Sequence, residues 1–191
     1  MGIRKVTMED NPTALPDLYG NLCQLRPLMV EHVSSNYVGW LNDPQINQYL
    51  ESRFAEHTLE SVRSFVSDII TNGSAWLYGI WVVSDSEPNG RHIGNIKLGT
   101  INYNHWTADI GFLIGDREYW GKGIASEAIS LLVNFGFKRG FRKITAGAYE
   151  NNFGSAKAML NAGFEVEGVR RNQIVFNGER SGVTLFGIQC P

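Results

Sequence analysis

The sequence lacks several features that mark whole classes of protein. Its only two cysteines, Cys23 and Cys190, lie far apart and outside any CxxC pair, so no zinc site is indicated. They could pair with each other, but two reduced thiols in a cytoplasmic protein are the simpler interpretation. No segment approaches the roughly 18 apolar residues of a membrane-spanning helix. Met1–Asp10 also lacks the long apolar stretch of a signal peptide. We therefore expect a cytoplasmic protein that does not bind a membrane.

An excess of charge of one sign is also missing. The 191 residues include 17 Lys and Arg against 19 Asp and Glu, for a formal net charge of −2. Proteins dedicated to binding nucleic acid usually carry a clear basic excess, so nucleic acid is not an expected partner. Hydrophobic residues make up 43% of the chain, which allows a substantial core and excludes a disordered chain.

The hydrophobic pattern predicts strands and helices that alternate along one domain. Met1–Gly20 is an ambiguous leader, and the domain covers Asn21–Pro191. Alternating or continuous apolar runs predict strands at Asn21–Leu28, Trp76–Ser84, Arg91–Tyr103, Ala108–Gly115, Lys143–Tyr149, Phe164–Val175 and Ser181–Ile188. Apolar positions three and four apart predict helices at Glu31–Leu41, Pro44–Leu50, Thr58–Gly73, Ser126–Lys138 and Ser155–Ala162. This order predicts an α/β (α+β) fold on one mixed sheet.

Glycine is abundant: 21 of the 191 residues are glycine, which is about 11% against an average of about 7%. The most informative ones lie in Asp109–Ala128 (DIGFLIGDREYWGKGIASEA), where Gly121 and Gly123 form a loop between a strand and a helix. Glycine lets backbone N–H groups approach a ligand, and a helix N-terminus offers unpaired N–H donors. The stretch predicts a phosphate or pyrophosphate site, although a glycine turn that only caps the helix would give the same pattern. The loop matches neither a P-loop nor GxGxxG.

Three segments in register carry a family resemblance: WGKGIASEAI, KITAGAYE and NNFGSAKAMLNAGFEVEG. The chain resembles the GNAT superfamily of N-acetyltransferases, in its RimJ/RimL-like branch, from about Leu22 to Gln189. Gly123 and Ala125 match the family's acyl-CoA loop, [Q/R]xxGx[G/A], with Trp120 in place of Gln or Arg. The residues that match the family's later Asn, Ser and Gly-Phe positions are Asn152, Ser155, Gly163 and Phe164.

The resemblance implies a mixed, mostly antiparallel sheet that splays to bind acetyl-CoA and is flanked by helices. Acetyl-CoA is then the co-substrate, and no metal is expected. Loop amides would hold the pyrophosphate of coenzyme A, and strand backbone would face its pantetheine arm. The residues that the resemblance assigns to the coenzyme are Phe112, Leu113, Ile114, Trp120, Gly121, Lys122, Gly123, Ile124, Ala125, Ser126, Asn152, Ser155 and Lys157.

The implied chemistry is direct acyl transfer, in which a neutral amine attacks the thioester. Such a reaction needs a base for the amine proton and an acid for the departing thiolate. Many family members use a tyrosine as the acid, but Met159 stands in that position, and Ser155 is the implied replacement. A helix-capping serine is the alternative interpretation of Ser155. The candidate bases, in order, are Asp109, His105 and Glu150.

The acceptor is expected to be a small-molecule amine, bound between Trp40–Arg53, the Asn102–Trp106 loop and the final hairpin. Its candidate ligands are Tyr49, Arg53 and Trp106, because aromatic rings stack on sugars or bases and arginine binds diphosphates. The stretch WLNDP is similar to family members that acetylate nucleotide-linked amino sugars. The alternatives are a protein N-terminus, another small amine, or a non-catalytic acyl-CoA-binding module. The chain is expected to be a monomer or a homodimer.

Overall fold

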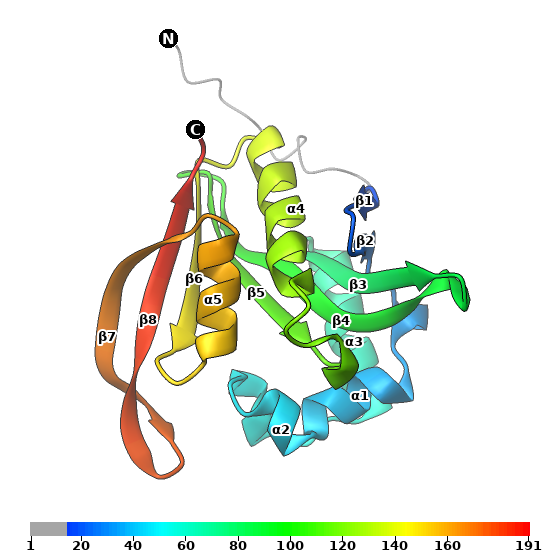
Figure 1. Ribbon diagram of the computed structural model, residues 1–191, viewed down its shortest axis with the longest axis horizontal. Coiled ribbons are helices and arrows are strands. Elements are labelled where there is room, and N and C mark those ends of the chain that lie inside the picture. The colour runs from blue at the N-terminus through cyan, green and yellow to red at the C-terminus, as the bar shows by residue number, and fades with distance from the viewer. Residues whose placement is uncertain (1–14) are drawn as a thin grey trace.

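The computed structural model describes residues 15–191, which form one sheet with helices on both faces (Figure 1). Within this range eight strands follow the order β1-β2-β3-β4-β5-β6-β8-β7. They are β1 (Leu18–Tyr19), β2 (Gln24–Pro27), β3 (Trp76–Ser84), β4 (Glu87–Asn102), β5 (Thr107–Ile114), β6 (Lys143–Tyr149), β7 (Glu165–Phe176) and β8 (Glu179–Gln189). Neighbouring strands are antiparallel except β5 and β6, which are parallel. The predicted mixed, mostly antiparallel sheet is confirmed.

The helices divide the core between the two faces of the sheet. The larger core packs under α4 (Ile124–Lys138) and α5 (Phe153–Asn161). The smaller core packs under α1 (Ser35–Asn42) and α3 (Leu59–Asn72). The short α2 (Pro44–Asn47) and the 3-10 turn η3 (Glu51–Phe54) link these two helices at the edge of the molecule (Figure 1). Two further 3-10 turns are η2 (Val30–His32) and η4 (Arg117–Tyr119).

The strongest local signals predicted their elements correctly. Strands β3 and β6 have the predicted bounds. Thr58 starts α3 by accepting a 3.1 Å hydrogen bond from the Ser61 N–H, and Gly73 ends the helix with a φ of 56°. These elements were predictable because period, cap and glycine stop all lie within one segment.

Several predicted helix bounds were wrong because other residues act as caps. Helix α1 begins at Ser35 rather than Glu31, since Ser34 accepts a 3.3 Å hydrogen bond from the Tyr37 N–H. Helices α4 and α5 begin two residues earlier than predicted, with Gly123 and Asn152 as their N-caps. The predicted helix over Pro44–Leu50 ends at Asn47.

The turn between the third and fourth strands is tighter than predicted. The turn was expected over Ser84–Gly90, but Ser84 pairs directly with Glu87. Strand β4 therefore starts earlier and forms a longer hairpin with β3.

The two parallel strands β5 and β6 pair only at their beginnings. Thr107, Ala108 and Asp109 lie opposite Lys143, Ile144 and Thr145, and beyond them the strands separate. Their outer edges remain paired with β4 and β8. The facing edges therefore leave backbone N–H and C=O groups open to the gap between them.

The predicted leader, Met1–Gly20, lies largely outside the described residues. Leu18 and Tyr19 form β1 and pair with Leu25 and Gln24, so this part of the leader borders the sheet. The boundary between leader and domain stays a prediction. Within residues 15–191, no helix is long and apolar enough to cross a membrane.

Candidate active site

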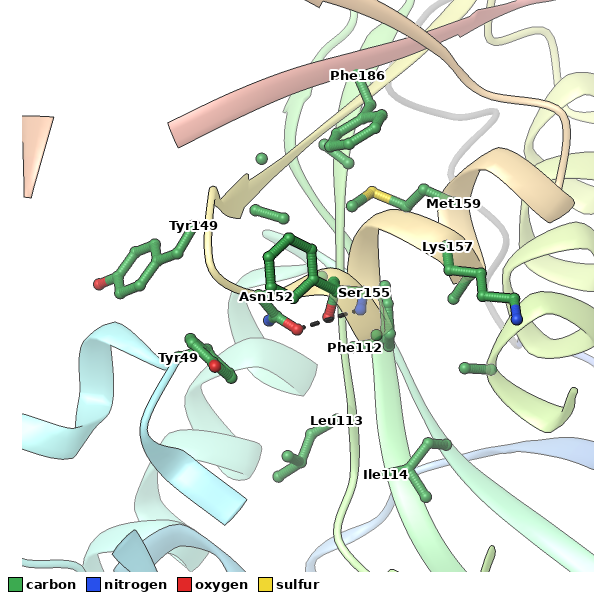
Figure 2. A pocket seen from close by; sticks show the side chains of 18 of the residues that line it. Tyr49, Phe112, Leu113, Ile114, Tyr149, Asn152, Ser155, Lys157, Met159 and Phe186 are labelled. Carbon is green, nitrogen blue, oxygen red and sulfur yellow. Dashed lines mark hydrogen bonds between the residues drawn. The ribbon is translucent and has the colours of Figure 1, made fainter. Parts of the chain in front are cut away.

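A cleft of about 1180 Å³ opens where β5 and β6 separate. It is lined by both strands, the glycine loop, the start of α5, the α2–η3 segment and parts of β7 and β8. Figure 2 shows the side chains of Phe112, Leu113, Ile114, Asn152 and Ser155 around this space. The cleft thus joins the predicted coenzyme residues to the predicted acceptor segment.

Glycines keep the centre of the cleft free of side chains on the face covered by α1 and α3. Side chains alternate between the two faces of a strand. On β5, Leu113 packs into the core under α1 and α3. Positions 111 and 109, two and four residues earlier, therefore lie on this same face. On β6 the matching residues are Thr145, Gly147 and Tyr149. A Cβ added at Gly111 would meet no atom within 4 Å. The cleft is therefore free of side chains at Gly111, near its centre.

The loop between β5 and α4 has the backbone geometry of an anion site. Gly121 and Gly123 have φ values of 73° and 81°, a left-handed conformation that favours glycine. A Cβ added at Gly121 would meet no atom within 4 Å. The indole N–H of Trp120 donates a 2.7 Å hydrogen bond to the Ile114 carbonyl, which fixes the loop against the end of β5. The N-terminus of α4 is thereby directed to the cleft with its unpaired N–H groups.

Most of the predicted coenzyme residues line the cleft. Those in the loop and the first turn of α4 are Trp120, Gly121, Gly123, Ile124, Ala125 and Ser126. Lys157 also lines it, from α5. Lys122 does not, because its ammonium group is turned toward the Tyr119 ring, 5.2 Å from the ring centroid.

Glu127, which was not a predicted site residue, holds the segment before β2 beside the glycine loop. Its carboxylate accepts hydrogen bonds from the backbone N–H groups of Asn21, Leu22 and Cys23 at 2.8, 2.8 and 2.9 Å. Burial alone would raise the pKa of Glu127, but these hydrogen bonds outweigh it and lower the pKa below the usual glutamate value. These hydrogen bonds hold Leu22 beside Gly123. A Cβ added at Gly123 would lie 3.6 Å from Leu22 Cδ1. No local pattern links residues so far apart in the sequence.

Asn152 and Ser155 meet at the start of α5. The Asn152 Oδ1 accepts a 3.1 Å hydrogen bond from the Ser155 backbone N–H, so its amide N–H₂ group is what remains for a ligand (Figure 2). Ser155 lines the cleft, and Met159 does so one turn further along the helix. A thioether has no proton to donate, so of these two side chains it is the Ser155 hydroxyl that can act as an acid.

Of the three candidate bases, Asp109 lies in the cleft. It stands at the narrow end, where its Oδ2 accepts a 3.1 Å hydrogen bond from the Thr145 hydroxyl. Burial raises the pKa of Asp109, and this outweighs the opposite effects of Thr145 and Lys97. A carboxylate with a raised pKa is a stronger base than an ordinary aspartate.

His105 and Glu150 lie outside the cleft, contrary to expectation. His105 belongs to the turn before β5, at the end of that strand opposite the glycine loop, and its N–H donates to Asn102 Oδ1 at 3.2 Å. Glu150 follows β6, but its carboxylate accepts a 2.7 Å hydrogen bond from the Gly182 N–H of β8. Both residues are close in sequence to the strands that line the cleft. His105 lies at the wrong end of β5, and the Glu150 carboxylate is held by the backbone of β8.

Of the three candidate acceptor ligands, Tyr49 lines the cleft and the other two do not. Its ring stacks on Phe176 with the centroids 5.2 Å apart. Arg53 lines an adjoining groove between η3 and the β7–β8 hairpin. Trp106 packs against Phe141, with ring centroids 6.0 Å apart, and does not line the cleft. The expectation that all three form one pocket was wrong, because Trp106 shares the turn that carries His105.

Two further residues, Tyr149 and Glu51, line the cleft and were missed as site residues. The Tyr149 hydroxyl donates a hydrogen bond to the Glu51 carboxylate. Burial raises the pKa of Tyr149, and the hydrogen bond to Glu51 adds to this effect. Tyr149 ends a correctly predicted strand beside the gap, which was a usable signal. Glu51 lies within the predicted acceptor segment, but nothing in the sequence distinguished its carboxylate.

Comparisons with known proteins identify the family of the chain. The model of the acetyltransferase (GNAT) domain family matches residues 23–165. A probable N-acetyltransferase of Bacillus subtilis, YjcK, is 30% identical over 169 residues, which cover 84% of this chain and 90% of that protein.

Solved structures of the same fold include enzymes bound to coenzyme A. Spermidine N-acetyltransferase from Vibrio cholerae, in complex with CoA and spermine, has a TM-score of 0.77 and 21% identity, and the match covers 90% of this chain and 97% of that one. RimL, a ribosomal L7/L12 alpha-N-protein acetyltransferase in complex with CoA, has a TM-score of 0.76 and 20% identity over 91% and 98% of the two chains. At such identities the likeness shows the fold, while the family assignment comes from the family model and the sequence relatives. The chain belongs to the GNAT acetyltransferase family and is an N-acetyltransferase.

Proposed function

We propose that the protein transfers an acetyl group from acetyl-CoA to a primary amine through this cleft. The observation that carries the proposal is the junction of the open N-terminus of α4 with the unpaired facing edges of β5 and β6. A helix N-terminus suits a pyrophosphate, and open strand edges suit the amide groups of an extended pantetheine arm. Both similar structures above hold coenzyme A, which supports the same use here.

The side chains of the cleft supply the proton transfers. The acceptor nitrogen attacks the thioester carbon, a C–N bond forms and the C–S bond breaks. Asp109, directly or through water, takes the proton that the amine loses, and the Ser155 hydroxyl donates a proton to the departing thiolate. Proton exchange with solvent then restores the Asp109 carboxylate and the Ser155 hydroxyl. A backbone N–H on the open edge of β5 polarises the carbonyl oxygen as negative charge develops on it. Asn152 and Lys157 bind the coenzyme from α5.

The positions of the candidate ligands support some of the expected contacts to the acceptor and remove others. A nucleotide-linked amino sugar is supported by the Tyr49 ring and by Arg170, which also lines the cleft. It loses the support of Arg53 and Trp106, which lie outside. A small amine or a protein N-terminus is the second candidate, since the Vibrio enzyme is a spermidine acetyltransferase and RimL acts on a ribosomal protein.

Thiol release from acetyl-CoA tests the proposal. The assay combines the protein with a nucleotide-linked amino sugar, glucosamine, spermidine and a peptide with a free N-terminus. We expect turnover with at least one of these amines. Coenzyme A binding without turnover on any amine would instead indicate an acyl-CoA-binding module, and absence of coenzyme binding would overturn both functions.

A further inference from the structure

The charged side chains that line the cleft differ in how they are neutralised. They are Glu51, Asp109, Lys157, Glu167 and Arg170. Glu167 forms an ion pair with Lys143, with 2.6 Å between Oε1 and Nζ. Asp109 lies at the narrow end against Thr145. Glu51 remains as the carboxylate on the α2–η3 side, and within residues 15–191 it forms no ion pair with a cationic side chain.

The Tyr149 hydroxyl holds Glu51 in place, and Arg53 reaches Glu51 through that hydroxyl rather than in a direct ion pair. The Tyr149 hydroxyl donates to Glu51 Oε1 and accepts a 2.8 Å hydrogen bond from Arg53 Nη1. The same Arg53 nitrogen donates to the Leu50 carbonyl at 2.8 Å, and the guanidinium lies 4.1 Å from the Phe54 ring centroid. Arg53 is thus held at Tyr149, and the phenol hydroxyl lies between its positive charge and Glu51.

Among residues 15–191, the second oxygen of Glu51 accepts no hydrogen bond from another side chain or from the backbone. Carboxylates form their strongest hydrogen bonds with ionised donors such as ammonium groups. A primary aliphatic amine is protonated at neutral pH, like the lysine side chain. The α2–η3 wall of the cleft therefore offers an incoming cation an exposed carboxylate that Tyr149 holds in place.

We propose that the Glu51 carboxylate, oriented by Tyr149, binds the ammonium group of the acceptor and selects cationic amines. This inference rests on the proposed function, because the bound cation is the acetyl acceptor, which releases one proton to solvent before its neutral amine attacks the thioester. Tyr149 acts as a positioning residue through its hydrogen bond to Glu51, and Arg53 acts in turn through its hydrogen bond to Tyr149. The same carboxylate would serve an amino sugar or an aliphatic amine, because both present an ammonium group.

The test measures amine binding separately from coenzyme binding. Calorimetry determines the Kd of spermidine and of glucosamine for the coenzyme A-saturated protein, in the wild type, in Glu51→Gln and in Glu56→Gln. Glutamine keeps the shape of the side chain and an oxygen that accepts from Tyr149, but removes the charge. Glu56 is the matched control, because it is a nearby acidic residue that lines the adjoining groove instead of the cleft.

We expect Glu51→Gln to raise the Kd of the amine that binds by about 10-fold or more, as for the loss of a hydrogen bond to a charged group. The Kd of coenzyme A should be unchanged in both variants. Equal amine affinity in Glu51→Gln and the wild type would overturn the inference. So would a wild type that binds coenzyme A but neither amine. A wild type that does not bind coenzyme A would overturn the proposed function, and the inference with it.

Discussion

Two carboxylates beside the cleft have pKa values shifted in opposite directions. Burial raises the pKa of Asp109, whereas three backbone N–H donors lower that of Glu127 despite its partial burial. The first shift favours a group that takes up a proton during a reaction, and the second favours one that stays ionised. These shifts agree with the proposed role of Asp109 as the base and with the hydrogen bonds by which Glu127 holds residues 21–23.

Replacing Asp109 with asparagine should slow acetyl transfer by about 10²–10⁴-fold in kcat, since this is the usual contribution of a general base. The KM for acetyl-CoA should change little, because the side chain lies at the narrow end of the cleft. In the wild type, kcat should fall at acidic pH, with a midpoint above the ordinary aspartate pKa, as Asp109 becomes protonated. Steady-state rates over a pH series measure both effects. An unchanged kcat in the variant would exclude Asp109 as the base.

Replacing Glu127 with glutamine should destabilise the fold by about 1–2 kcal/mol, because an amide N–H₂ group would oppose one or more of the backbone donors. The folded-state pKa of Glu127 is lower than its unfolded value. The stabilisation is therefore complete above the usual glutamate pKa of 4.5 and is lost as the pH falls through the lower folded value. Urea unfolding at pH 7 and at pH 3 measures this, with Glu60→Gln on the exposed start of α3 as the control. A wild type and variant that differ equally at both pH values would contradict the assignment.

The strand–loop–helix element from β5 to α4 could be predicted from the sequence, whereas most of the residues that fix it could not. Gly121 and Gly123 stand in a local pattern that predicts a turn and a helix start. The contacts of Trp120 with Ile114 and of Glu127 with residues 21–23 depend on how distant segments pack. His105 and Glu150 illustrate the same limit. A residue next to a strand in the sequence reaches the site only if it lies at the strand end that borders the cleft. Its side chain must also not be held by a backbone group elsewhere.

The loop itself is tested by substituting Gly123. Glutamate at this position should abolish coenzyme A binding, because it adds a negative charge at the start of α4 and a bulky side chain beside Leu22. Alanine reports the cost of a Cβ at a φ of 81° alone, and should bind coenzyme A more weakly without losing it. Calorimetry with coenzyme A compares the two. Normal binding by Gly123→Glu would show that the pyrophosphate does not lie at this loop.

The whole molecule consists of two halves of a sheet joined at a narrow seam. One half holds β1 to β5 and the other holds β6, β8 and β7, and the seam between them is three residue pairs of β5 and β6. Helices α4 and α5 also pack against each other. A ligand that hydrogen-bonds both open edges would therefore complete the sheet and connect the halves.

Coenzyme A should for this reason stabilise the entire fold rather than the loop alone. A ligand at 100 times its Kd adds about 2.7 kcal/mol to the free energy of unfolding. For a chain of this length, that corresponds to a rise in Tm of about 5–10 °C. Differential scanning calorimetry measures the shift, and hydrogen exchange locates it. The slowed amides should include those of β5 and β6 that face the gap. Gly123→Glu provides the control, since its Tm should not respond to coenzyme A. Protection confined to the start of α4 would mean that the pantetheine arm does not bridge the two strands.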